Sequence, residues 1–398
     1  MPNAYVELLR TPGGPAFSAA AFVARLPISM YGIGIVLLVE GETGRYGVAG
    51  GVAATFILAA AFGQPLLSRR IDRLGQARAA FPLLAVHIVA MAVMVWAASA
   101  DQQAALIAAA AVTGASLPNF GALVRARWSL IYGGRPMLRT AFSFESVVDE
   151  AVFVIGPPLV TILAVVIGVG PALLSTVVLV AVGGTAFLLQ RGTEPPPAPA
   201  GRLEGRGALR NPGMPLLMLV MACLGGVFGS VEVTAVAFAD GQGSAGEAGL
   251  ILASYAFASM VAGITYGARH PTAPLDRQLR IGLAAMAVTL LALPFAPTTP
   301  WLIGAVLLAG ATIAPTLIVG FSLVERLVPD ARLTEGLTLI STALSLGVSV
   351  GALAAGQVID GAGASSAFWV ATVSGGLAAA IVLTWGRTLR AHAEGAAA

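Results

Sequence analysis

The sequence predicts an all-α membrane protein with twelve transmembrane helices in two six-helix, pseudo-symmetric halves. Three observations lead to this fold class. Twelve apolar runs are each long enough to cross a bilayer as a helix, which takes about 20 residues. Nearly every arginine lies on one side of these runs, and a stretch rich in proline, glycine and charge follows the sixth run. Only helices or closed barrels satisfy backbone groups in lipid, and the runs are continuous rather than alternating, so the pattern predicts helices.

The composition excludes a soluble protein. The chain is 57% apolar and 10% charged, with a mean hydropathy of +0.88, whereas a soluble domain is about 25% charged. The net charge of +3 comes from arginines in the connections, so it indicates topology and no nucleic-acid partner is expected. The single Cys223 excludes an internal disulfide, and three scattered histidines argue against a metal site. No Gly-Lys-Ser/Thr phosphate loop is present, so direct ATP drive is not expected. The sequence shows no set of residues for chemistry on a substrate, so neither a cofactor nor enzymatic activity is expected.

The twelve spans follow from the lengths of the apolar runs, and the ninth is the shortest because Pro294 and Pro297 end it. The first half holds spans at roughly 17–39, 46–67, 79–99, 104–124, 140–166 and 172–190. The second half holds spans at roughly 214–239, 248–267, 281–296, 301–324, 336–358 and 366–386.

The distribution of arginine predicts the orientation. The connections after the even-numbered spans and the segment before span 1 carry the arginines, whereas the opposite connections hold only Arg45. Positive residues stay on the cytoplasmic side, so both termini and the middle loop are expected in the cytoplasm of a multi-pass protein of the cell membrane. All five tryptophans fall at expected membrane interfaces, where their amphipathic rings are stable: Trp96, Trp128, Trp301, Trp369 and Trp385.

A linker divides the chain into its two halves. Residues 191–213 read RGTEPPPAPAGRLEGRGALRNPG and have no apolar face, so they are expected to form a partly extended cytoplasmic linker. The six-helix halves are then 1–190 and 214–398. A parallel six-plus-six repeat is typical of transporters, with the substrate site near the bilayer midplane between the halves.

The loop after span 2 carries a family resemblance. It reads GQPLLSRRIDRLGQAR, and its Asp72, Arg73, Gly75 and Arg78 match the signature loop of the major facilitator superfamily. The leading glycine of that signature is replaced by Ser68. Together with twelve spans, the resemblance implies the major facilitator fold and a secondary transporter that works by a rocker-switch motion.

A second resemblance lies in span 5, in the segment FVIGPPLV. Its Gly156-Pro157 pair is similar to the antiporter motif of the same family, although the flanking glycines of that motif are missing. The resemblance suggests antiport.

Electrostatics alone also suggests a role for the signature loop. The carboxylate of Asp72 is expected near the start of span 11, where Thr334 could cap the helix and Glu335 follows. A helix N-terminus attracts negative charge, so this contact would hold the halves together on the inner side and favour the outward-open state. Arg73, Gly75 and Arg78 belong to the same gate. The alternative is a solvated turn whose charges only set the topology.

Charged residues inside the spans are candidate site residues, because a charge at mid-bilayer costs about 2.5–3.5 kcal/mol. Arg25 lies about two turns into span 1, and Ser29 follows it at helical spacing, so both are expected to contact substrate from one face of the helix. An arginine does not release its proton, so Arg25 is expected to bind an anionic group of the substrate or to pair with a carboxylate. The alternative is that its side chain reaches the cytoplasmic interface. Tyr31 and Tyr255 lie mid-span and are expected to contact substrate or to pack in the core.

Three carboxyl groups inside the spans are candidates for proton coupling. Asp149 and Glu150 lie about three turns into span 5 and point about 100° apart, so they cannot face one partner. Asp149 either binds and releases a proton or forms a permanent ion pair with Arg25. Glu232 lies deep in span 7, the counterpart of span 1, near several glycines and without a cation close in sequence. Enclosed there, it is expected to be neutral at rest and charged when water or substrate reaches it.

Two other features are assigned to packing. His87 is the only histidine within a span, and span 3 is peripheral in this architecture. Gly347, Gly351 and Ala355 form a ridge of small residues on span 11, which permits close approach of another helix.

These observations together predict a monomeric, proton-coupled secondary transporter that works by alternating access and exports a small amphipathic or drug-like molecule. Its expected partners are a small-molecule substrate, protons and the lipid bilayer. The first alternative is uptake or uniport of a nutrient or organic anion, with Arg25 as the ligand of the anion. The second alternative, from a different class, is a membrane receptor or scaffold that does not transport.

Overall fold

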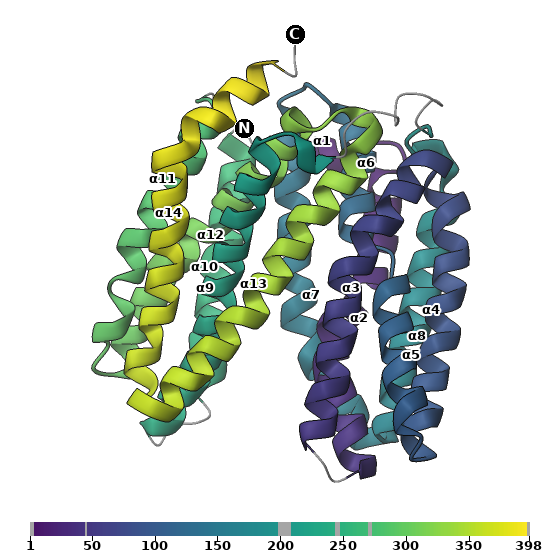
Figure 1. Ribbon diagram of the computed structural model, residues 1–398. Helices are drawn as coiled ribbons and strands as arrows, with labels where there is room; N and C mark the ends of the chain where they lie inside the picture. Colours follow the sequence, from purple (N-terminus) through teal and green to yellow (C-terminus); the bar gives the residue numbers. More distant parts are fainter. Residues whose placement is uncertain (1–3, 44–45, 198–207, 243–246, 270–272, 396–398) are drawn as a thin grey trace. The chain divides into compact units, whose positions relative to one another are not determined.

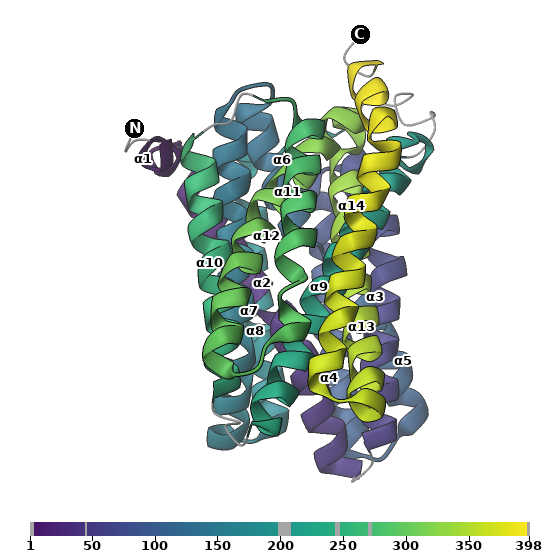
Figure 2. The same ribbon diagram turned by 90° about the vertical axis from the view of Figure 1, so that its left-hand side faces the viewer.

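A computed structural model describes residues 4–43, 46–197, 208–242, 247–269 and 273–395 (Figures 1 and 2). Within these ranges, twelve helical segments are long and apolar enough to cross a membrane. The same ranges contain helices and no strand. The predicted all-α fold class with twelve spans is therefore confirmed.

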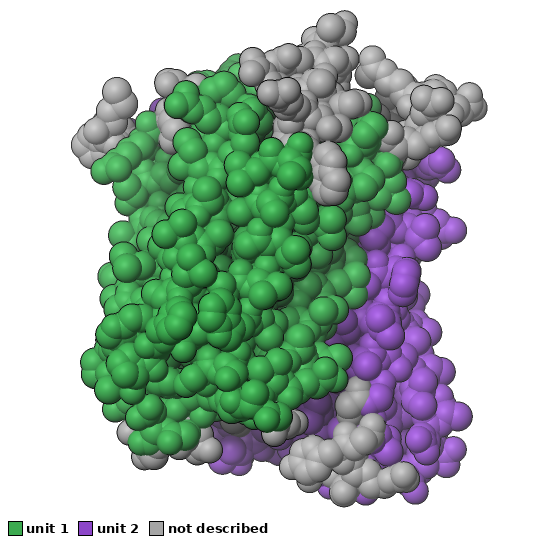
Figure 3. Space-filling view, turned by 60° about the vertical axis from the view of Figure 1, so that its left-hand side comes forward, with its two compact units in different colours: residues 1–5, 134–147, 206–398 green, residues 6–133, 148–205 purple. Residues whose placement is uncertain are grey.

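The chain forms two compact units, coloured separately in Figure 3. Unit 1 comprises residues 1–5, 134–147 and 206–398, and unit 2 comprises residues 6–133 and 148–205. The division of the sequence into halves at 1–190 and 214–398 stays a prediction. Residues 198–207 of the expected linker lie outside the described residues.

Unit 2 holds the first six spans apart from the beginning of the fifth. Within it α2 packs against α8, and both α3 and α4 pack against α5. Its helices are α2 (Gly14–Thr43), α3 (Tyr46–Leu74), α4 (Gln76–Ser99), α5 (Gln103–Ser116), α6 (Phe120–Tyr132), the larger part of α7 (Met137–Ile167) and α8 (Val169–Leu189).

The fourth span is two helices rather than the single continuous one expected at 104–124. The helix α5 ends at Ser116 and α6 begins at Phe120. The break lies at Pro118, because proline has no N–H for the helix and disfavours helical backbone in the residue before it. The side chain of Asn119 accepts a hydrogen bond from the N–H of Ala122 (3.0 Å) and caps the new helix. The second helix continues to Tyr132, so the predicted end at residue 124 was wrong.

Unit 1 holds the last six spans. Here α9 packs against α13 and α14, and α10 packs against α12 (Figures 1 and 2). Its helices are α9 (Gly213–Gly241), α10 (Ala248–Arg269), α11 (Leu275–Leu290), α12 (Thr299–Leu327), α13 (Leu333–Ala362) and α14 (Ala364–Gly395), with short 3₁₀ turns η4 (Leu293–Phe295) and η5 (Asp330–Arg332).

The contact between α9 and α13 depends on glycine. A Cβ added at Gly347 would lie 1.9 Å from the carbonyl oxygen of Ala222, and one at Gly351 would lie 2.3 Å from that of Gly226. On the other helix, a Cβ at Gly225 would also meet the backbone of α13. The small-residue ridge predicted on span 11 therefore serves close helix packing, as expected.

The first turns of α7 belong to unit 1 because their hydroxyl groups bind α10. Thr140 donates a hydrogen bond to the carbonyl of Gly267 (2.9 Å), and Ser143 donates one to Gly263 (2.6 Å). Tyr5, in the short helix α1 (Ala4–Leu9), places its hydroxyl 2.9 Å from the Oγ of Ser143. Burial raises the pKa of Tyr5 above its ordinary value, so the hydroxyl stays protonated as a donor.

Candidate functional site

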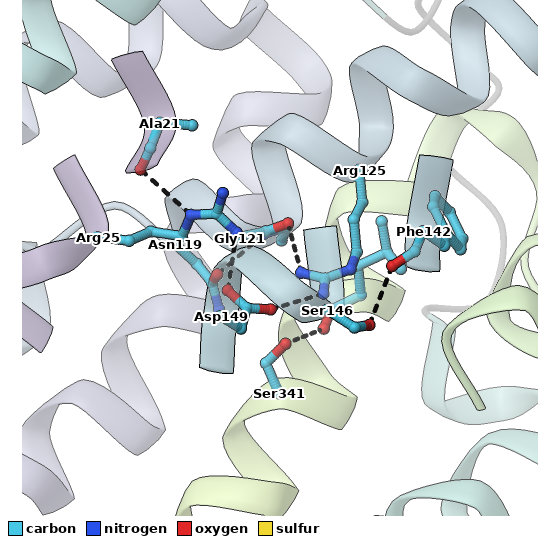
Figure 4. Close-up of polar contacts among 11 residues, drawn as sticks. Ala21, Arg25, Asn119, Gly121, Arg125, Phe142, Ser146, Asp149 and Ser341 are labelled. Carbon is cyan, nitrogen blue, oxygen red and sulfur yellow. Dashed lines mark hydrogen bonds and ion pairs between the residues drawn. The ribbon is translucent and has the colours of Figure 1, made fainter. Parts of the chain in front are cut away.

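Arg25, Arg125 and Asp149 form one ion cluster inside unit 2 (Figure 4). The Nη1 of Arg25 lies 2.7 Å from Oδ1 of Asp149, and the Nη2 of Arg125 lies 2.6 Å from Oδ2. The three residues come from α2, α6 and α7. Further donors of both guanidinium groups bind backbone carbonyls one turn earlier, Arg25 to Ala21 (3.2 Å) and Arg125 to Gly121 (3.1 Å).

The burial of this ion cluster differs between its members. The side chains of Arg25 and Arg125 are 3% and 2% exposed, whereas that of Asp149 is 34% exposed. Two guanidinium groups on one carboxylate stabilise its ionised form, since hydrogen bonds and nearby opposite charge both favour it. Of the two alternatives for Asp149, the geometry therefore favours the permanent ion pair, and Arg25 points into the bundle rather than to the interface.

Sequence reasoning missed Arg125 as a member of the site. The residue was assigned to the connection after span 4, because that span was expected to end at residue 124. The break at Pro118 starts a new helix that carries Arg125 into the interior. The signal in the sequence was Pro118, because a break at this proline lets the fourth span continue past residue 124.

Ser29 and Gly156 mark the crossing of α2 and α7. The Oγ of Ser29 lies 2.8 Å from the carbonyl oxygen of Val152 and 3.0 Å from that of Leu26, and it is the donor to both. A Cβ added at Gly156 would lie 1.9 Å from this Oγ. The glycine of the Gly156-Pro157 pair therefore permits a close crossing, and the hydroxyl of Ser29 is engaged there. A contact between Ser29 and substrate stays a prediction.

Tyr31 and His87 form a hydrogen-bonded pair in the interior of unit 2. Both side chains are fully buried. The Nδ1 of His87 lies 2.9 Å from the carbonyl of Thr113, which only accepts, so this nitrogen carries a proton. The Nε2 then accepts from the hydroxyl of Tyr31 at 2.7 Å, in the neutral form of the ring. The structure thus places Tyr31 in the packed core, and its expected contact with substrate stays a prediction.

Glu232 lies on α9 and its side chain is exposed. The expectation that its surroundings enclose it was wrong, because neighbouring glycines bring backbones close but carry no side chains to cover a carboxyl group. Glu232 makes no ion pair with any residue that the structure describes. One turn earlier, Phe228 packs edge-on against Tyr255, with ring centroids 6.2 Å apart. Tyr255 itself is 6% exposed.

Glu150, the remaining candidate for proton coupling, is half-buried on α7 next to Asp149. Adjacent helical residues point about 100° apart, so the side chain of Glu150 leaves the helix in a different direction from that of Asp149. Its role in coupling stays a prediction.

The signature loop is held by a glycine and by a carboxylate from the segment that follows the sixth span. Gly75 has φ +90°, a left-handed conformation that favours glycine, and α4 begins directly after it. The Oε1 of Glu194 accepts a hydrogen bond from the N–H of Ala77 (3.0 Å) in the first turn of α4. A negative charge is favourable at that helix end. Arg73 and Arg78 are exposed.

Buried Arg127 joins the same end of α4 to α6 and α8, which sequence reasoning did not detect. Its Nε donates to Oε1 of Gln76 (2.8 Å) and its Nη1 donates to the carbonyl of Gln190 (2.8 Å). Its guanidinium carbon lies 3.8 Å from the centre of the Phe187 ring, in a cation–π contact. These contacts fix the signature loop within unit 2.

The partners expected for Asp72 lie at the start of α13 in unit 1. This helix begins at Leu333, so Thr334 is its second residue and not its N-cap. The reason is that η5 runs directly into α13, and Arg332 takes the N-cap position. Glu335 is fully buried and accepts from Nη1 of Arg332 (3.0 Å). Asp72 is half-buried on α3, and its gating contact with the other unit stays a prediction.

The comparison with family models identifies the class of protein. The model described as Major Facilitator Superfamily matches residues 17–274 and 234–397. These matches cover most of the chain, so the protein belongs to the major facilitator superfamily. Among curated proteins, no sequence match was found.

Solved structures support the fold. A bacterial homologue of the iron transporter ferroportin in an outward-facing state matches with TM-score 0.75 and 16% identity, over 93% of this chain and 98% of that one. The human organic anion transporter MFSD10 (TETRAN) matches with TM-score 0.67 and 17% identity, over 92% and 99%. The transporter FucP in the outward conformation matches with TM-score 0.68 and 15% identity, over 96% and 99%. At these identities the likeness shows the fold of a major facilitator transporter alone.

Proposed function

We propose that this protein is a proton-coupled secondary transporter that works by alternating access and exports a small amphipathic or drug-like molecule. The observation that carries the coupling role is Glu232, a carboxyl group within a transmembrane helix that is exposed and has no ion pair among the described residues. A group that binds and releases protons must be reachable and must not be held ionised by a fixed cation. Glu232 meets both conditions.

Asp149 meets both conditions less well than Glu232 does. Both of its oxygens are engaged by arginines at 2.7 and 2.6 Å, so protonating one oxygen would remove one charge-assisted hydrogen bond and weaken the other. We therefore assign Asp149, with Arg25 and Arg125, to holding α2, α6 and α7 together. Glu150 remains the second choice for the coupling group.

One coupling carboxylate is energetically sufficient. Moving one charge through 100 mV supplies about 2.3 kcal/mol, or roughly a fifty-fold substrate gradient. No hydrolysis of a nucleotide is needed for transport on this scale.

Export is supported by the antiporter-like Gly156-Pro157 pair in α7. Gly156 permits the close crossing of α2 with α7, since an added Cβ would overlap Ser29. Tight packing at this crossing favours a rigid pair of α2 and α7, which would move together during transport.

Transport of an organic anion is the second candidate, favoured by the exposed third of the Asp149 side chain. An anionic group that reaches this carboxylate could compete with it for the guanidinium groups of Arg25 and Arg125. This reading places the substrate rather than a proton at the ion cluster. It does not require export.

The experiment is flux of a substrate library in proteoliposomes, with and without an imposed pH gradient. The library contains cationic, neutral and anionic amphipaths. Glu232→Gln keeps the size of the side chain but cannot ionise, so we expect it to lose pH-driven accumulation and to retain exchange of substrate for substrate. The matched control is Glu42→Gln, an exposed glutamate at the end of α2, which should keep pH-driven accumulation.

Normal pH-driven flux in Glu232→Gln would remove Glu232 from the mechanism and move the coupling role to Asp149 or Glu150. Flux of anions alone, unaffected by the pH gradient, would instead favour the second candidate.

A further inference from the structure

An apolar groove runs along unit 1 between α10 and α12, which lie side by side in Figure 2. Its volume is about 590 Å³. Phe257 and Val261 of α10 and Leu307 and Ala311 of α12 line its walls, and Arg269 lies at one end. None of the transport residues considered above lines it.

The groove opens onto an exposed apolar surface of unit 1. Phe257 is 58% exposed and Val261 is 44% exposed. The surface around the groove carries further large exposed apolar side chains, Ile264 on α10 and Leu308 on α12. In a protein that spans a membrane, such a surface contacts hydrocarbon. An acyl chain is therefore a matching occupant for the walls.

The length of the groove corresponds to one leaflet. The residues from Phe257 to Arg269 span about 18 Å of helix, at 1.5 Å per residue. Half of the hydrocarbon core of a bilayer is about 15 Å thick. An acyl chain that fills the groove would thus bring its headgroup to the level of Arg269.

The end of the groove is basic. Arg269 is exposed in the last turn of α10, and it forms no ion pair with any described residue. Tyr266, which also lines the groove, has Arg139 beside it as a hydrogen-bond partner. Basic pockets between transmembrane helices at the membrane surface bind anionic lipid headgroups. The basic end therefore matches an anionic headgroup, and the apolar walls match the acyl chain of the same lipid molecule.

We propose that this groove is a binding site for a membrane phospholipid with an anionic headgroup, whose acyl chain lies between α10 and α12 and whose phosphate contacts Arg269. The site stands apart from the transport mechanism, so it can be tested whatever the substrate is. Occupancy would fill a hollow beside the packed contact of α10 with α12, and would make the stability of unit 1 sensitive to the charge of the lipid.

The test is native mass spectrometry of the full chain, titrated with phosphatidylglycerol or with phosphatidylcholine of the same acyl composition. One arginine near the surface should favour the anionic lipid about fivefold in apparent affinity. Arg269→Gln should remove this preference. Arg277→Gln, an exposed arginine on the neighbouring α11 that does not line the groove, should keep it.

A second variant, with its own control, tests whether the lipid lies between the apolar walls of the groove. Ala311→Trp places a large ring in the groove and should reduce binding of both lipids, whereas Val288→Trp on the exposed face of α11 should not. A phosphatidylglycerol with a photoreactive acyl chain should crosslink the unmodified protein within residues 257–269 and 307–315. Equal affinity for the two lipids, an equal loss in Arg277→Gln, or crosslinks confined to other helices would each overturn the proposal.

Discussion

At the scale of single residues, the carboxyl groups of Asp149 and Glu232 differ in their ionic partners. Two arginines from different helices bind the two oxygens of Asp149, while Glu232 has no ionic partner among the described residues. A buried charge that loses its partner is costly, whereas an exposed pair contributes little. The cluster is therefore a structural feature whose removal should affect stability before it affects coupling.

Asp149→Asn should lower the free energy of unfolding by on the order of 2 kcal/mol, because it leaves two buried guanidinium groups without their carboxylate. The value is below the roughly 3–5 kcal/mol of a fully buried pair, since a third of the Asp149 side chain is exposed. Arg25→Ala should share the defect. Thermal or denaturant unfolding in detergent measures it.

The control is Arg280→Gln, which removes a one-turn ion pair with Asp276 on α11 whose arginine is 37% exposed. This control should lower the free energy of unfolding by less than about 0.5 kcal/mol. A cost in Asp149→Asn no larger than in this control would show that the ion cluster does not stabilise unit 2.

At the scale of helices, two local sequence features determine the packing. Pro118 divides the fourth span and so brings Arg125 to Asp149. Glycines on α9 and α13 let the two backbones meet, and a ridge of this kind is visible in the sequence at four-residue spacing. The sequence did not predict that α9 is the partner, because a ridge of small residues permits close approach of any neighbouring helix.

Two glycines of α13 provide a matched test of this contact. Gly351→Ala should destabilise unit 1 by about 1–3 kcal/mol, because the new Cβ would lie 2.3 Å from the backbone oxygen of Gly226. Gly356→Ala adds the same methyl group where nothing lies within 4 Å, so it should be neutral or stabilise the helix by up to about 1 kcal/mol. Unfolding midpoints of the two variants decide this, and equal midpoints would contradict the packing role of Gly351.

At the scale of the whole molecule, the arginine distribution predicts how the chain lies in the membrane. Single cysteines in a Cys223→Ser background test it with a thiol reagent that does not cross membranes. Those at Gly41 and Gly361 should react from outside intact cells, and both positions have open space around them. Cysteines at Gly133 and Gly192 should react only after the membrane is opened, because they lie on the arginine-rich side. Labelling of Gly192 in intact cells would overturn the orientation.

The fold class, the number of spans and the family could be predicted from the amino-acid sequence, because apolar runs and a signature loop are local in sequence. The sequence also identified Arg25 and Asp149 as exceptional residues, since charges inside apolar runs are rare, and gave their ion pair as one of two alternatives. Tertiary structure alone decided that Arg125 joins them, that Arg127 and Glu194 hold the signature loop, and that Glu232 is exposed. Each of these depends on which helix faces which, and that follows from side-chain packing between residues far apart in the chain. The same reason applies to the lipid groove, which exists only where α10 and α12 lie side by side.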